Sequence, residues 1–340
     1  MKTCILGASG YTGSELAKLI QQHPQFSLET LFVSENSEDA NKKLGDIHGH
    51  LNSIVDLPLT PLTQIQLANL GDEFDLIFLA TPHQASHDWM PILLNKRAKV
   101  FDLSGAFRLQ DTQVFADFYG FEHQHLGALS QAVYGLAEWY KTEISNADFV
   151  AVPGCYPTAS LLATKPLIYA ELLDCNHWPI VNAVSGVSGA GRKATLTNSL
   201  CEVSLQAYGV LSHRHTPEIS AYLGQDVIFT PHLGNFKRGI LATITCRLKY
   251  GVKATQIEQV FSAAYADKAM IRLLNTPPKL DNVVGQPFCD LYWQYDQSSG
   301  YMVITSAIDN LLKGAASQAV QCANLRFGLA DTCGLLERGE

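Results

Sequence analysis

One cysteine stands at a position where proteins make a thiol nucleophilic. Cys155 follows Val152, Pro153 and Gly154 at the end of a predicted strand, and Pro157 lies in the first turn of a predicted helix. A helix N-terminus stabilises a thiolate, because its dipole and its free N–H groups favour negative charge. We interpret Cys155 as a catalytic nucleophile, and the alternative is a buried structural cysteine.

A thiolate nucleophile also needs a group that moves protons. His213 and His215 flank Arg214 in one short segment, and we predict His213 as the acid/base and His215 as a substrate contact. A pair of loop histidines at this spacing could instead belong to the surface. No third ligand stands near the pair in the sequence, so no metal site is predicted.

The N-terminal region contains a glycine-rich turn between a predicted strand at residues 3–7 and a predicted helix. Its spacing is G-x-x-G-x-x-G, and glycine permits both positive φ and close approach of a pyrophosphate to the helix N-terminus. An ordinary tight turn is the alternative reading. We predict that a dinucleotide contacts Gly7, Ser9, Gly10, Tyr11, Thr12 and Gly13.

The end of the second predicted strand indicates which dinucleotide binds. Many NAD enzymes place a ribose-binding carboxylate there, whereas this chain has Ser34 and Ser37 on either side of Glu35 and Asn36. The two hydroxyls can hydrogen-bond a 2′-phosphate, although Glu35 would oppose one if it pointed inward. NADP(H) is therefore the predicted cofactor.

A second glycine-rich loop follows a later predicted strand, at residues 185–192. We expect Ser188 and Gly189 to form part of the cofactor site, with a flexible loop as the alternative. Arg108 and Arg238 are candidates to hold the phosphate or carboxylate of a substrate, or else are solvated surface arginines. Four other histidines are expected to be structural or on the surface, although His83 follows a predicted strand and is a minor candidate: His48, His50, His83 and His87.

These groups need a scaffold, and the apolar pattern supplies one. Short, nearly continuous apolar runs alternate with helical segments in the first half of the chain, at residues 3–7, 28–33, 74–80, 99–104 and 149–152. This pattern predicts an α/β fold, a Rossmann-type doubly wound parallel sheet covered on both faces. We assign residues 1–153 to this dinucleotide-binding domain.

The second half of the chain has a different pattern. A helix is predicted at residues 157–173, followed by strands at residues 180–184, 227–230, 240–248 and 302–307. We expect an α+β catalytic and oligomerisation domain over residues 154–312, with an antiparallel or mixed sheet. A final amphipathic helix at residues 311–327 should pack back on the first domain, so that residues 313–340 complete it.

Composition excludes several classes of protein. The 340 residues carry a net charge of −8 and are 47% hydrophobic, which disfavours nucleic acid as a partner. No apolar run reaches the roughly 18 residues of a membrane span, and no signal peptide is visible, so a cytoplasmic protein is expected. Eight scattered cysteines predict neither a disulfide scaffold nor a zinc site.

Six motifs together resemble one family. GASGYTG, FDLSGAFR, VPGCYPT, SGVSGAGR, HRHTPEI and DNLLKGA occur in this order between residues 7 and 315. In this combination the chain closely resembles the N-acetyl-gamma-glutamyl-phosphate reductases. The resemblance implies a two-domain fold related to aspartate-semialdehyde dehydrogenase, an NADP site at the first motif, catalytic Cys155, and an acid/base histidine in HRH. It also implies that Asn310 lies near the nicotinamide and that the protein is a homodimer or homotetramer.

The implied reaction is reduction of N-acetyl-gamma-glutamyl phosphate through a thioester on Cys155, a step in arginine biosynthesis. Aspartate-semialdehyde dehydrogenase is the nearest alternative, since it shares cofactor, nucleophile and chemistry. A cysteine hydrolase would use Cys155 with His213 but would not need the glycine turn. A cofactor-sensing binding protein would keep that turn and could dispense with Cys155.

Overall fold

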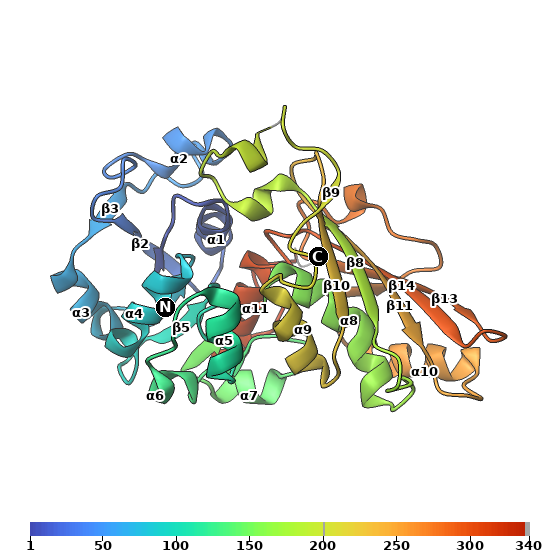
Figure 1. Cartoon of the computed structure of the whole chain (residues 1–340). Coiled ribbons are helices and arrows are strands. Elements are labelled where there is room, and N and C mark those ends of the chain that lie inside the picture. The colour runs from blue at the N-terminus through green and yellow to red at the C-terminus, as the bar shows by residue number, and fades with distance from the viewer. Residues whose placement is uncertain (200, 337–340) are drawn as a thin grey trace. The chain divides into compact units, whose positions relative to one another are not determined.

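A computed structural model describes residues 1–199 and 201–336, which fold into two compact units (Figure 1). The first unit contains Met1–Ala116, Phe121–Gly154 and the chain from Ala315 onward, and the second contains Asp117–Gly120 and Cys155–Gly314. Residues 337–340, the end of the segment expected to complete the first domain, lie outside the described residues. In the described part, no helix has the length and apolar character needed to cross a membrane.

The first unit is built on a seven-stranded sheet in the order β3-β2-β1-β4-β5-β7-β6, and every pairing is parallel. The order reverses direction between β1 and β4, which is where doubly wound sheets bind ligands at the carboxyl ends of their strands. The strands are β1 (Lys2–Leu6), β2 (Ser27–Ser34), β3 (Leu59–Leu62), β4 (Leu76–Leu79), β5 (Lys99–Asp102), β6 (Val133–Tyr134) and β7 (Phe149–Ala151).

Helices cover both faces of this sheet. One buried cluster contains apolar residues of α1, α7 and α11, and a second contains those of α3 and α4. The predicted doubly wound α/β fold is therefore confirmed, and α11 packs against α1 and α7. The helices of this unit are α1 (Tyr11–Gln21), α2 (Leu44–Ile47), α3 (Gln64–Glu73), α4 (His83–Leu93), α6 (Leu126–Leu129), α7 (Lys141–Asn146) and α11 (Ala316–Arg326). Helix α5 (Thr112–Tyr119) is divided, with Thr112–Ala116 in the first unit and its last residues in the second.

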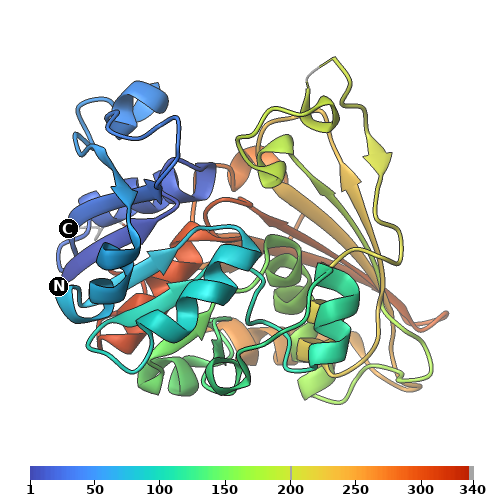
Figure 2. The same ribbon diagram turned by 60° about the vertical axis from the view of Figure 1, so that its left-hand side comes forward.

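The second unit is built on another large sheet (Figure 2). Its seven strands lie in the order β12-β13-β14-β11-β8-β10-β9. It is mixed: β8 pairs in parallel with β10, and β12 with β13, while the other pairings are antiparallel. The strands are β8 (Ile180–Ser185), β9 (Gln206–Ala207), β10 (Ile228–Leu233), β11 (Ile240–Arg247), β12 (Ile271–Leu273), β13 (Cys289–Asp296) and β14 (Tyr301–Ile308).

Helix α8 (Cys155–Tyr169) packs against β11, β13 and β14 and against α9 (His215–Leu223) and α10 (Ala254–Tyr265). It is buried on nearly all sides, so an all-round apolar sequence suits it better than an amphipathic one. Its two central hydroxyls are satisfied within the helix, since Ser160 donates to the Tyr156 carbonyl and Thr164 to the Ser160 carbonyl.

Several predicted elements needed correction. The first helix of the second unit begins at Cys155 rather than residue 157 and ends four residues early, before Glu171 with its positive φ of 55°. The final helix begins at Ala316 rather than residue 311, because Asp309 accepts the backbone N–H groups of Leu311 and Leu312 and forms a turn. Strands β3, β6, β9, β12 and β13 and helices α9 and α10 were not predicted.

Candidate active site

Cys155 is the first residue of α8, where the N–H groups of the first helical turn and the helix dipole favour a thiolate. Its side chain is half-buried, which is compatible with attack on a small substrate. Gly314 lies directly against it: a Cβ added to Gly314 would stand 2.8 Å from the Cβ of Cys155. The thiol position is thus bounded by the turn that follows β14.

Arg108 holds the backbone just before the cysteine. Its Nε donates to the Val152 carbonyl at 2.8 Å, and its Nη2 donates to the Leu103 carbonyl at 2.8 Å. The side chain is buried, with 5% exposure. Through these two bonds Arg108, the predicted contact to a substrate anion, ties together the segments that follow β5 and β7.

His213 lies in the same unit as Cys155, on the turn before α9. Its Nδ1 accepts the backbone N–H of His215 at 3.1 Å, so the neutral ring carries its proton on Nε2. Burial, with a smaller contribution from the Arg214 charge, lowers the pKa of His213 to about 4. At neutral pH this residue is therefore an uncharged donor through Nε2–H.

His215 is placed differently from the predicted loop histidine. It is the first residue of α9 and is buried. Its ring centroid lies 4.8 Å from that of His213 and 5.9 Å from that of Tyr156. The two histidines therefore lie together beside the first turn of α8, with His213 the more exposed of the pair.

Asn310 connects two loops that the sequence had singled out separately. Its Nδ2 donates to the Ser188 hydroxyl at 3.0 Å, and its Oδ1 accepts the Gly239 N–H at 2.6 Å. A Cβ on Gly189 would lie 3.8 Å from the same amide nitrogen. Ser188, Gly189 and Asn310, all predicted to contact the cofactor, thus form one cluster.

Arg238 lies beside this cluster and is held by a buried carboxylate. Its Nε donates to Asp309 at 2.5 Å, and the same carboxylate oxygen accepts the Gly285 N–H at 2.6 Å. The Arg238 side chain is 21% exposed, whereas Asp309 is fully buried. The pairing orients the guanidinium and offsets part of its positive charge. A substrate anion at Arg238, as predicted, would therefore be attracted less strongly than by an unpaired arginine.

In the first unit, the turn after β1 has the geometry expected of a pyrophosphate cradle. Gly7 has a φ of 81°, and a Cβ there would stand 2.3 Å from the Ala80 carbonyl oxygen. A Cβ on Gly13 would stand 2.4 Å from the Gly7 oxygen. Among the described residues no side chain caps α1, and an uncapped helix N-terminus of this kind is suited to an anion.

The two serines predicted to recognise a 2′-phosphate lie at the carboxyl end of β2. The turn after β1 is tied to this strand, because the N–H groups of Gly7 and Ala8 both donate to the Phe32 carbonyl. Ser34 is exposed at the end of the strand, and the Ser37 hydroxyl accepts the Asp39 N–H at 3.2 Å. The neighbouring strands thus present the glycine turn and the serines at one edge of the sheet.

Of the four histidines expected to be structural or on the surface, some are buried and others are exposed. His48 is buried, and its Nε2 bonds the Ser9 carbonyl oxygen at 2.9 Å within the glycine turn. His50 is exposed. His83 begins α4, and its Nδ1 accepts the Gly105 N–H at 2.7 Å.

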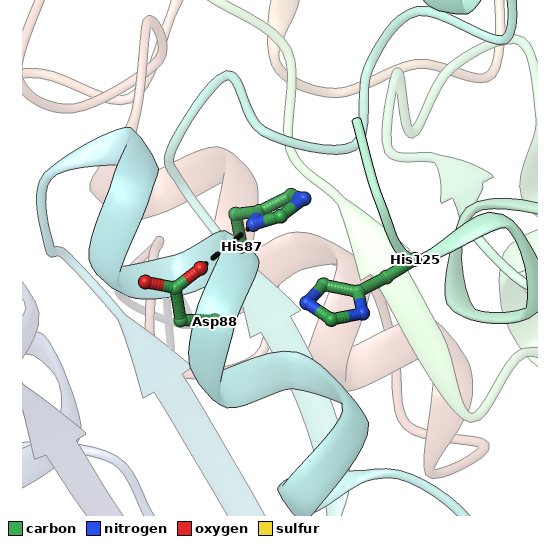
Figure 3. A group of neighbouring side chains, drawn as sticks. All are labelled: His87, Asp88 and His125. Carbon is green, nitrogen blue, oxygen red and sulfur yellow. Dashed lines mark hydrogen bonds and ion pairs between the residues drawn. The ribbon is translucent and has the colours of Figure 1, made fainter. Parts of the chain in front are cut away.

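The fourth, His87, belongs to a group that invites a metal interpretation. His87, Asp88 and His125 offer ligand atoms within 4.8 Å of one another (Figure 3). However, His87 Nε2 accepts the Gln124 N–H at 3.1 Å, so its Nδ1 carries the proton and donates to Asp88 at 2.8 Å. Both ring nitrogens are used without a metal, and we assign the group a structural role.

Two family models match the chain: the semialdehyde dehydrogenase NAD-binding domain over residues 2–147 and the semialdehyde dehydrogenase dimerisation domain over residues 155–310. An N-acetyl-gamma-glutamyl-phosphate reductase of Pseudoalteromonas atlantica is 65% identical over 336 residues, which cover 99% of this chain and 98% of the relative. The chain belongs to the N-acetyl-gamma-glutamyl-phosphate reductase family.

Solved structures similar to this member of the N-acetyl-gamma-glutamyl-phosphate reductase family share its fold at low identity. Aspartate semialdehyde dehydrogenase II of Vibrio cholerae has a TM-score of 0.72 and 17% identity, covering 96% of this chain and 98% of that one. The Candida albicans aspartate semialdehyde dehydrogenase, solved with NADP, has a TM-score of 0.65 and 15% identity, covering 95% and 97%. These likenesses support the two-unit fold.

Two features around the candidate nucleophile of this N-acetyl-gamma-glutamyl-phosphate reductase family member were missed in the sequence. Tyr208 contacts the ring of His213, with centroids 5.4 Å apart, and Gly314 contacts Cys155. Gly314 belongs to the DNLLKGA motif, so its presence there was a usable signal. Tyr208 stands outside all six motifs and gave none.

Proposed function

We propose that the protein catalyses the NADPH-dependent reduction of N-acetyl-gamma-glutamyl phosphate to N-acetylglutamate 5-semialdehyde and phosphate, in the cytoplasm, as a step of arginine biosynthesis. The observation that carries this proposal is the 65% identity to a relative of that name over nearly the whole of both chains. The position of Cys155 at the start of α8 supports the chemistry.

Cys155 is the proposed nucleophile. Its thiolate attacks the γ-acyl carbon, a C–S bond forms, and the C–O bond to phosphate breaks, which gives a thioester and inorganic phosphate. The thioester is electrophilic enough to accept a hydride, whereas a free carboxylate is not. Bound NADPH supplies that hydride. Breaking the C–S bond of the resulting thiohemiacetal then releases the aldehyde and restores the thiolate.

His213 is the proposed acid group of the site, as a hydrogen-bond donor to the reacting oxygen. Its Nδ1 is occupied by the His215 N–H, so Nε2–H is the group that can donate to the oxygen on which negative charge develops. The proton stays on the ring, because a neutral imidazole that lost it would become an imidazolate. The oxyanion adduct collapses directly: its C=O bond forms as the C–S bond breaks, which releases the aldehyde and the thiolate. The depressed pKa of His213 keeps the ring uncharged before reaction at neutral pH.

The cofactor would be held by the N-terminal glycine turn and by the serines after β2. The cradle in which a Cβ on Gly7 or Gly13 would collide with backbone fits a pyrophosphate, and the exposed Ser34 fits a 2′-phosphate. Ser188 and Asn310 in the second unit are proposed to contact the nicotinamide half. Arg238 and His215 are proposed to contact the substrate.

The reverse reaction tests the proposal most directly. NADP reduction is followed in the presence of phosphate with N-acetylglutamate semialdehyde and aspartate semialdehyde offered in parallel. We expect strong preference for the acetylated aldehyde. Activity with aspartate semialdehyde alone would overturn the substrate but keep the Cys155 chemistry, and silence with both would favour a cofactor-sensing protein.

We also propose that the protein is a homo-oligomer that pairs through the open face of the second sheet. Ile228, Ile180, Thr245 and Val303 are register partners in a row across β10, β8, β11 and β14, so they share one face, and the three apolar ones are at least 36% exposed. An exposed apolar row of this kind is typical of an interface. A Val303→Glu variant should sediment as a smaller species than the wild type.

A further inference from the structure

Four rings surround the imidazole of His213 in the second unit. Tyr156, Tyr208 and Phe229 lie edge-on to it, with centroids at 5.7, 5.4 and 5.5 Å, and His215 lies at 4.8 Å. We call Tyr156, Tyr208, Phe229 and His215 the aromatic box. The proposed reaction assigns no role to its two tyrosines.

A hydrogen-bonded tether holds one wall of the box in place. The Tyr156 hydroxyl donates to the His232 carbonyl at 3.1 Å, which leaves its oxygen to accept from the Tyr208 hydroxyl at 3.2 Å. The Tyr208 N–H donates to the Pro231 carbonyl at 3.1 Å. Tyr208 is thus fixed at both its backbone and its hydroxyl.

The chain after Tyr208 also wraps around the histidine. Gly209 has a φ of 53°, and a Cβ there would lie 3.4 Å from the Cβ of His213. The Ser212 N–H donates to the Gly209 carbonyl at 3.1 Å, which closes this turn. Tyr208 is therefore joined to His213 by a short, closed turn as well as by ring contact.

The tyrosines also face the candidate nucleophile. Burial is the main cause that raises the pKa of both Tyr156 and Tyr208. Tyr208 is the next cause for Tyr156, and a negative charge on Cys155 adds a smaller contribution to both. Both phenols consequently stay protonated and keep the tether intact throughout the neutral range. Tyr208 therefore packs on the ring of His213 as a neutral phenol, without being needed to move a proton.

We propose that Tyr208 is a positioning residue for His213: its tethered ring closes the aromatic box and keeps the imidazole dry and in one orientation. This inference rests on the proposed function insofar as His213 donates a hydrogen bond to the reacting oxygen. The charged and titratable groups that face His213 are Arg214 and His215 at the start of α9, Tyr156 on α8, and Tyr208. Of these, Arg214 adds to burial in lowering the pKa of His213.

The test compares three variants. Tyr208→Ala removes the wall, Tyr208→Phe keeps the ring without its hydroxyl, and Tyr250→Ala, at a fully exposed tyrosine, is the matched control. The titration of His213 is followed by NMR of histidine-labelled protein, assigned with His213→Asn, and kcat and KM are measured across pH with the preferred aldehyde.

We expect Tyr208→Ala to raise the pKa of His213 from about 4 toward its ordinary 6.5, by at least about one unit. The acid limb of the kcat profile should move with it, and kcat should fall about tenfold with little change in KM. Tyr208→Phe should keep the low pKa and restore most of kcat, because the ring is retained.

An unchanged His213 titration in a folded Tyr208→Ala protein would overturn the inference, as would an equal change in Tyr250→Ala. If Tyr208→Ala does not fold, Tyr208→Phe and Tyr208→Leu decide the matter: Leu must raise the pKa of His213 relative to Phe. The NMR titration needs no turnover. If the wild-type protein is inactive with both aldehydes, the proposed function is refuted, and the NMR titration still tests whether Tyr208 positions His213.

Discussion

Gly314 packs so closely against Cys155 that there is no space for a side chain at position 314. A Cβ on Gly314 would stand 2.8 Å from the Cys155 Cβ and 2.7 Å from the Asn310 carbonyl oxygen, both closer than real Cβ atoms approach. The neighbours of that Cβ include rigid backbone, so an alanine there must displace the start of α8, the turn after β14, or both.

The first prediction follows from this contact. Gly314→Ala should lower kcat on the order of a hundredfold, because a shift of about 1 Å at a nucleophile is enough to do so. Gly127→Ala, where an added Cβ meets nothing within 4 Å, is the matched control. Steady-state kinetics with a thermal unfolding curve for each variant would check it, and a folded, fully active Gly314→Ala would contradict it.

The second prediction concerns Cys155, the proposed nucleophile. Cys155→Ser should lose turnover by on the order of 10³-fold or more, since a hydroxyl is far less ionised than a thiol. NADP affinity should be unchanged, because the proposed cradle lies in the first unit. Cys175→Ser, at an exposed cysteine, controls for general loss of thiol. Retained activity in the Cys155 variant would rule out a thioester mechanism.

A third prediction tests recognition of the 2′-phosphate. Ser34→Asp places a negative charge at the carboxyl end of β2 and should weaken NADP binding at least about tenfold by repulsion, while NAD binding changes little. Ser27→Asp adds the same charge at the exposed amino end of the same strand and should have no effect. Calorimetric titration of both cofactors would measure this, and equal losses for NADP and NAD would argue against Ser34 as a 2′-phosphate contact.

The fourth prediction uses a buried histidine away from the proposed chemistry. Burial, followed by the charges of His87 and His125, lowers the pKa of His123 to about 4. In the unfolded chain His123 has its ordinary pKa of 6.5, so between pH 6.5 and about 4 the unfolded chain binds a proton at His123 that the folded chain does not bind. Stability from this group is complete above pH 6.5 and is lost as pH falls from 6.5 toward 4.

Urea unfolding at several pH values would measure the effect. His123→Gln should show a shallower loss of unfolding free energy between pH 6.5 and 4 than the wild type, even if its stability at pH 8 is lower. His50→Gln, at an exposed histidine, should follow the wild-type curve. Parallel pH dependences for wild type and His123→Gln would refute the assignment.

The sequence predicted the local structure better than the contacts between distant segments. The buried strand at Leu76–Leu79 was recognisable because a fully covered strand is an unbroken apolar run. Strand β13 was not, since its Tyr, Trp and Gln residues include half-exposed positions and mix the apolar and polar patterns. A helix after Cys155 followed from the residues around it, although its first residue did not.

The candidate site shows the same division. Side-chain motifs pointed to Ser188, Asn310 and His213, but nothing local in the sequence shows that Asn310 bonds the Ser188 loop or that Tyr208 packs on His213. The same holds for Arg108. A motif identifies an arginine, whereas only the tertiary structure shows that backbone carbonyls receive its N–H groups.

Asn310 also has a consequence for how the chain comes to fold. Its two side-chain hydrogen bonds reach back over 122 residues to Ser188 and over 71 residues to Gly239. Contacts of such long sequence separation form late and slowly, because the intervening loops must first be closed. During synthesis, β8, β10 and β11 of the second sheet are therefore complete well before Asn310 is made. The hydrogen bonds that join the Ser188 and Gly239 loops to Asn310 can form only when the last tenth of the chain has been synthesised.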